Sequence, residues 1–60
     1  MKKILKTGFT PKYDHKVEIE EETDEDGDKY YSVLLNGKLS RYCRDNLKAA
    51  EIVFDRKINM

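Results

Sequence analysis

The residues best suited to chemistry in this chain are the carboxylates between Glu18 and Asp28. This stretch holds eight acids and no base within eleven residues. The whole chain has 12 acids and 12 bases, so the other 49 residues carry 12 bases against four acids. Charges add over a surface and raise the rate of association with an oppositely charged partner. This separation of acidic from basic residues predicts that the chain recognises its partner by electrostatic attraction.

Catalysis and metal binding are not indicated. His15 and Cys43 are the only histidine and cysteine, and a nucleophilic pair also needs an orienting group and a pocket. The alternating acids before Gly27 resemble the first half of a helix–loop–helix calcium loop, but Val33 stands where that loop needs a bidentate glutamate, and the flanks indicate strands. We expect a non-enzymatic protein with no metal and no cofactor.

A strand is expected to position the first of these acids. Val17 and Ile19 alternate with glutamates from residue 16 to 22, a pattern typical of a half-buried strand. Alternate side chains lie about 6.6–6.8 Å apart, close to the roughly 7 Å between phosphates along one nucleic-acid strand. This row and the turn after it would act as a DNA mimic toward a basic surface; the alternative is a solvated edge strand whose charges prevent aggregation. The acids in this prediction are Glu18, Glu20, Glu22, Asp24, Glu25, Asp26 and Asp28.

Two further strands are predicted from a hairpin signal. Residues 29–35 and 38–43 are rich in strand formers, and Asn36-Gly37 between them favours a type I′ turn. A two-residue loop would place Leu34 opposite Leu39 and Tyr31 opposite Tyr42.

The predicted fold class is α+β. Asp45 or Asn46 suits the N-cap of a C-terminal helix, and the apolar residues that follow have helical spacing. The chain is predicted to be a single small domain, a three-stranded antiparallel β-meander followed by one helix packed on one face (β-β-β-α). Its parts are a basic, loosely ordered lead-in over 1–15, a sheet over 16–43 and a helix over 45–58.

One helix covers one face of a sheet, so the other face should be partly exposed. Tyrosine tolerates such a position because its hydroxyl group stays hydrated. We expect Tyr31 and Tyr42 to serve as apolar anchors beside the acids. Use of the exposed face as a homodimer interface is an alternative.

The stretch from Gly27 to Ile58 resembles two kinds of DNA-binding domain that consist of three strands and a helix. These are the DNA-binding domains of ethylene-response factors and the arm-binding domains of integrases. The resemblance rests on Gly27, on Asn36-Gly37-Lys38, and on the helix from Lys48-Ala49-Ala50 to Phe54-Asp55-Arg56. It implies that the helix backs a sheet that enters the major groove. The DNA-contacting arginines of the family's first strand are replaced here by Glu18, Glu20 and Glu22. The resemblance is therefore used to predict the topology of the chain and not its activity.

A cytoplasmic location is expected, because a single cysteine forms no intramolecular disulfide and no apolar run approaches the about 18 residues of a membrane span. We predict a small interaction module or inhibitor, of the kind that phages and mobile elements encode. It would dock its acids onto a basic surface of a larger protein, including one that handles nucleic acid. The alternative is a nucleic-acid-binding domain that uses Lys38, Arg41, Arg44 and Tyr30.

Overall fold

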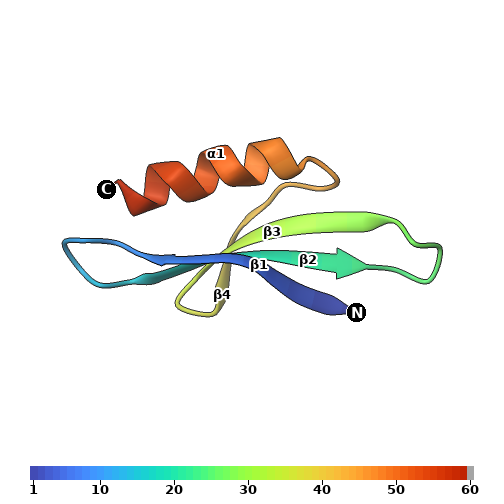
Figure 1. Cartoon of the computed structure of the whole chain (residues 1–60), viewed down its shortest axis with the longest axis horizontal. Coiled ribbons are helices and arrows are strands. Elements are labelled where there is room, and N and C mark those ends of the chain that lie inside the picture. The colour runs from blue at the N-terminus through green and yellow to red at the C-terminus, as the bar shows by residue number, and fades with distance from the viewer. Residues whose placement is uncertain (60) are drawn as a thin grey trace.

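The computed structural model describes residues 1–59 as a four-stranded antiparallel sheet with one helix across one face (Figure 1). The strands follow one another in the sheet in chain order. The elements are β1 (Lys2–Phe9), β2 (Lys16–Thr23), β3 (Lys29–Leu35), β4 (Lys38–Tyr42) and α1 (Leu47–Ile58).

The α+β class and the C-terminal helix packed on the sheet are confirmed, but the prediction of three strands is wrong. Lys2–Phe9, expected to be loosely ordered, forms β1 and pairs antiparallel with β2. Its sequence lacks alternation, so pairing with β2 determines the strand. Lys2 lies opposite Glu22 and Lys3 opposite Glu21, and opposite charges attract across strands.

Because β1 is present, the acidic strand β2 is not the edge strand that the sequence predicted. Because β1 pairs with one side of β2 and β3 with the other, β2 lies inside the sheet. The interpretation of its glutamates as charges that protect an edge strand is therefore wrong. The edges of this sheet are β1 and β4.

The core lies between α1 and the face of the sheet that carries Val17, Ile19 and Val33, all of which are buried. From the helix, Ala50 and Phe54 fill the space above them. Gly8 permits the close approach of the helix end to β1, because a Cβ atom there would lie 2.8 Å from Ile58 Cδ1. The fold thus rests on one thin apolar layer.

The hairpin at Asn36-Gly37 has the predicted turn and the predicted first pairs, but its register differs from the prediction farther from the turn. Both turn residues have positive φ angles, 52° and 82°, as a type I′ turn requires, and Leu34 pairs with Leu39. The expected pairing of Tyr31 with Tyr42 is wrong, because a bulge at Ser40 places Tyr42 opposite Ser32. A bulge shifts the register by one residue and turns the following side chains to the other face.

The helix begins where the sequence predicts. Asn46 is the N-cap, and its Oδ1 accepts the Ala49 N–H at 3.0 Å. Arg56 and Lys57 lie in the last turn, where positive charge interacts favourably with the negative end of the helix dipole. In the part of the chain that the structure describes, no helix is long and apolar enough to cross a membrane.

Replacement of Phe54 by alanine is expected to remove most of the stability. Phe54 is 4% exposed, and such truncations cost about 3–5 kcal/mol, which is comparable with the roughly 3–5 kcal/mol that a core this small supplies. Urea unfolding followed by circular dichroism measures the change. Ile52→Ala is the matched control, since Ile52 on the same helix is 48% exposed and should lose less than about 0.5 kcal/mol. Equal losses in both variants would contradict the described core.

Candidate functional site

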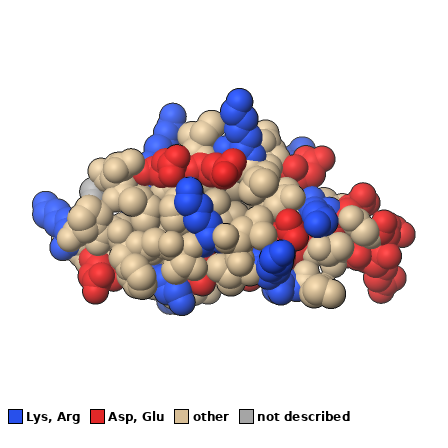
Figure 2. Space-filling model, in the orientation of Figure 1, with Lys and Arg blue, Asp and Glu red and all other residues tan. Residues whose placement is uncertain are grey.

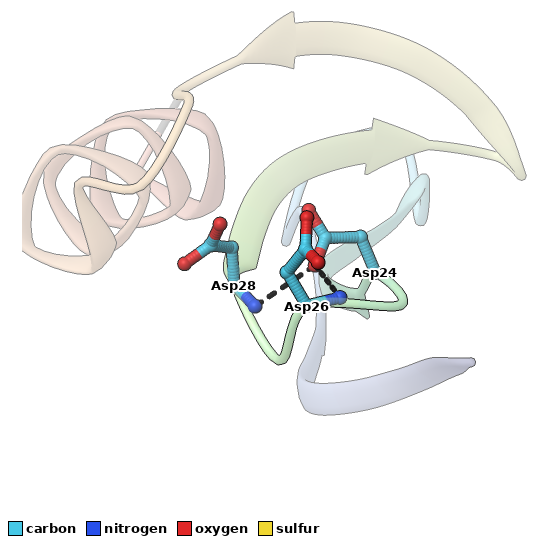
Figure 3. A group of neighbouring side chains, drawn as sticks. All are labelled: Asp24, Asp26 and Asp28. Atoms are coloured by element: carbon cyan, nitrogen blue, oxygen red, sulfur yellow. Dashed lines mark hydrogen bonds between the residues drawn. The ribbon is translucent and has the colours of Figure 1, made fainter.

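The acidic turn, residues 24–28, is built around the side chain of Asp24. Its Oδ1 accepts the N–H groups of Asp26 and Asp28, each at 2.9 Å (Figure 3). Gly27 has a φ angle of 87° and donates its N–H to the Asp24 carbonyl at 3.1 Å. Aspartate commonly fixes turns in this way, so Asp24 holds the loop and its neighbours project from it.

The carboxylates of Asp24, Asp26 and Asp28 lie within 4.8 Å of one another, and all are exposed (Figure 3). These are the carboxylates that could meet at a cation. However, Asp24 already accepts two backbone N–H groups, and the turn joins two strands. Val33, at the position where a calcium loop needs glutamate, is buried in the core. The arrangement therefore supplies concentrated negative charge rather than a complete calcium loop.

Tyr30 is the aromatic residue nearest to this charge. The Asp24 carboxylate, followed by partial burial and by Asp28, raises the pKa of the Tyr30 hydroxyl group. Negative charge disfavours a second anion beside it. Tyr30 therefore keeps its proton to higher pH than an isolated tyrosine and remains a hydrogen-bond donor at the edge of the acidic turn.

The outer face is the sheet face opposite α1. Along β2 it carries the row of Glu18, Glu20 and Glu22, which the register places opposite Thr7, Ile4 and Lys2 of β1. Lys16 forms an ion pair with Glu18 at 3.6 Å, and Lys2 one with Glu20 at 4.0 Å. Glu18 is also 9% exposed. The first two glutamates are thus partly neutralised within the chain, and Glu22 alone of the row is exposed.

The two tyrosines predicted as anchors lie on opposite faces. Tyr31 is 9% exposed and belongs to the core beneath α1, so it is not accessible to a partner. Tyr42 is 53% exposed and shares the outer face with Tyr30, because the bulge at Ser40 reverses its direction. The outer face also exposes the following apolar side chains: Ile4, Leu39 and, in part, Leu34.

The surface charge is uneven along the molecule. Its longest dimension is 40 Å. Figure 2 shows the largest group of acidic side chains at the end where β2 turns into β3, with basic side chains and smaller acidic groups spread over the rest of this view. Of the ion pairs formed within residues 1–59, none involves Glu22 or a residue of the acidic turn. The negative charge of these acids is therefore not compensated by an ion pair, although the Asp24 carboxylate is engaged in hydrogen bonds within the turn.

The basic residues of the alternative prediction are only partly brought together. Arg41 and Arg44 line one surface cavity of about 330 Å³ with Tyr42, whereas Tyr30 and Lys38 lie outside its lining. Sequence reasoning did not identify Asp45 and Asn46 as further members of this lining. No pattern in the sequence indicates the cavity, because it forms between the end of β4 and the start of α1.

No family model, curated protein or solved structure matches this chain. The resemblance to three-strand-plus-helix DNA-binding domains stays a prediction. In those domains the sheet face away from the helix enters DNA, and here that face carries Glu18, Glu20 and Glu22.

Replacement of Asp24 by alanine is expected to destabilise the hairpin. The loss should be about 0.5–2 kcal/mol, the range for an N-cap side chain that makes equivalent bonds to backbone N–H groups. The control is Asp26→Ala, which removes the same charge without those bonds and should change stability by less than about 0.5 kcal/mol. Urea unfolding of both variants checks the prediction, and a larger loss for Asp26→Ala would refute the assigned role of Asp24.

Removal of the Asp24 charge is expected to lower the pKa of Tyr30 toward its usual value. Asp24→Asn keeps the Oδ1 acceptor of the turn but removes the largest cause of the raised pKa. An NMR titration of the Tyr30 ring measures the change. In Asp26→Asn, which removes a charge that is not among those causes, the Tyr30 pKa should move less; the reverse order would be incompatible with the described turn.

Proposed function

We propose that the chain is a non-enzymatic interaction module, an inhibitor or regulator, that docks its acidic end onto a basic surface of a larger protein. The observation that carries the proposal is the grouping of exposed, unpaired carboxylates at one end of an elongated domain. The docking residues are Glu22, Asp24, Glu25, Asp26 and Asp28, with Glu18 and Glu20 behind them on the outer face.

Electrostatic steering supports this function. A concentrated patch of one sign raises the association rate with an oppositely charged surface, and the effect weakens as salt is added. The chain has no net charge, so its electric field is that of a dipole whose negative end is the acidic turn. A dipole of this kind attracts a basic surface and also turns the domain so that the acidic turn arrives first.

Apolar contact would supply the remaining affinity. Tyr30 and Tyr42 lie on the outer face beside the acids, and Leu39, which is 64% exposed, lies farther along it. Aromatic side chains dominate many protein interfaces because they bury a large area with few rotatable bonds. The acidic turn and these tyrosines together form a charged rim beside an apolar patch, and a basic surface with an exposed apolar centre is the complementary partner.

Charge reversal at the tip of the turn is expected to weaken partner binding. Glu25 is exposed and its side chain makes no hydrogen bond among those found in residues 1–59, so Glu25→Lys should change the field without unfolding the domain. The matched control is Glu51→Lys on the exposed side of α1, which makes the same change in net charge at another place. A partner captured from nuclease-treated lysate should bind Glu25→Lys about tenfold more weakly than the parent, and Glu51→Lys about as well as the parent.

The salt dependence provides the second readout. Because the attraction is between exposed charges, the affinity of the parent should fall as salt rises, and that of Glu25→Lys should fall less. Equal binding of parent and Glu25→Lys at low salt would contradict the proposal. Loss of capture on nuclease treatment would contradict it as well, since the basic residues would then act through nucleic acid.

A further inference from the structure

The outer face carries apolar side chains that no helix or strand of residues 1–59 covers. By register, four large hydrophobic residues lie on it, each between 43% and 64% exposed: Ile4, Phe9, Leu39 and Tyr42. Phe9 belongs to this face because it lies opposite Lys16, whose side chain forms an ion pair with Glu18 of the same face. Exposed apolar surface grouped on one face is typical of an interaction site. The outer face is therefore expected to bind a partner, and the charges around it indicate which one.

The two ends of the molecule differ in charge. In Figure 1 the acidic turn lies at one end, and the turn between β1 and β2, residues 10–15, lies at the other end with the last turn of α1. Lys12 belongs to this second turn, and Lys57 of α1 lines a cavity with residues of the same turn. Of the ion pairs formed within residues 1–59, none involves Lys12 or Lys57. With Arg56 they outnumber Asp14, the one acid of the turn, so this is the basic end of the molecule.

These two ends make a second copy of the chain a complementary partner. The chain has no net charge, so two copies have no overall repulsion, and a net charge near zero favours association. In a two-fold symmetric pair each copy presents the same surface, and every contact occurs twice. One chain supplies both the acidic turn and the basic end that fits it. A pair of copies therefore makes this attractive contact at two places.

The charges also select the arrangement of the pair. With the two outer faces stacked, a two-fold axis parallel to the strands would place one acidic turn over the other, and like charges repel. A two-fold axis across the strands places each acidic turn over the basic end of the other copy. The same axis stacks β4 on β4 in antiparallel fashion. Leu39 lies opposite Leu34 and Tyr42 opposite Ser32, so an axis passing between these two levels brings Leu39 of one copy onto Tyr42 of the other.

We propose that the outer face binds a second copy of this chain in this antiparallel arrangement. A stable interface buries about 800 Å² on each partner, which is less than a fifth of the 4520 Å² surface of the domain. Glu18 and Glu20 at the centre of the interface are paired with Lys16 and Lys2 of their own chain, so their burial leaves no carboxylate without a counter-charge. The dimer covers Tyr42 and the acidic turn and thus competes with docking to another protein, but the inference does not rest on that function.

The first test is sedimentation equilibrium of the isolated full chain, at concentrations up to about 1 mM and at about 0.01 M and 1 M salt. The expected result is a monomer–dimer equilibrium whose Kd rises about tenfold or more from low to high salt. The inference is overturned if the chain is a monomer throughout, if the Kd does not depend on salt, or if association continues beyond the dimer. No docking partner is present, so this outcome is distinguishable from the outcome of partner capture.

A charge exchange tests the antiparallel arrangement. Lys12→Glu and Glu25→Lys each place like charges together at both contacts of a homodimer, so each should raise the Kd about tenfold. In an equal mixture of the two variants, a heterodimer regains opposite charges at both contacts. The mixture should therefore associate about as strongly as the parent at low salt, which a misfolded variant would not do. Failure of the mixture to associate would overturn the arrangement.

A pair of apolar variants tests the face that is buried. Leu39→Ser on the outer face should raise the Kd of the dimer about tenfold. Ile52→Ser is the matched control, because Ile52 is 48% exposed and lies on α1, on the other side of the sheet; its dimer should have the Kd of the parent. Equal effects of the two substitutions would contradict the outer face as the interface.

Discussion

The packing of a single helix on one face of the sheet is the interaction on which the rest of this structure depends. Phe54 and Ala50 of α1 close the space over Val17, Ile19 and Val33, and this layer is the apolar core of residues 1–59. A domain of this length buries a smaller fraction of its surface than a large one. Because the single helix covers one face of the sheet, the outer face is in contact with water and must be partly polar. The alternation of glutamate with Val17 and Ile19 along β2 meets both demands at once.

The same constraint explains how the charges are arranged. Carboxylates on an inner strand lose part of their hydration, and the pairs Lys16–Glu18 and Lys2–Glu20 compensate for this loss. The basic character of β1 therefore has a structural use, since it supplies Lys2 to the acidic strand. Beyond the end of the sheet no such compensation is needed, because the turn is fully hydrated. The repulsion that remains there is offset by the two N–H groups bound to Asp24.

The parts that could be predicted from the sequence are those fixed by local pattern. The alternation at Val17 and Ile19, the Asn36-Gly37 turn and the Asn46 cap each act within a few residues, and each forms as expected. The strand β1 could not be predicted because its pattern is irregular and its pairing partner lies in β2. The faces of the two tyrosines could not be predicted, for two different reasons. The sequence does not determine which face of the sheet α1 covers, and α1 covers the face of Tyr31. The bulge at Ser40 turns Tyr42 to the other face. The acids of the site were identifiable from composition, whereas the cavity lined by Arg41 and Arg44 depends on how the end of β4 meets the start of α1.

The acidic turn acts on a partner only over a short range. Charges separated by more than about 8 Å are largely screened at physiological ionic strength, so the turn attracts a basic partner from a distance more weakly than it would in low salt. The ion pairs of β2 join atoms much closer together than this length, Lys16 with Glu18 at 3.6 Å and Lys2 with Glu20 at 4.0 Å, and partly buried pairs are screened less. Added salt therefore weakens the attraction of the turn for a partner before it disturbs the charges that the sheet itself compensates.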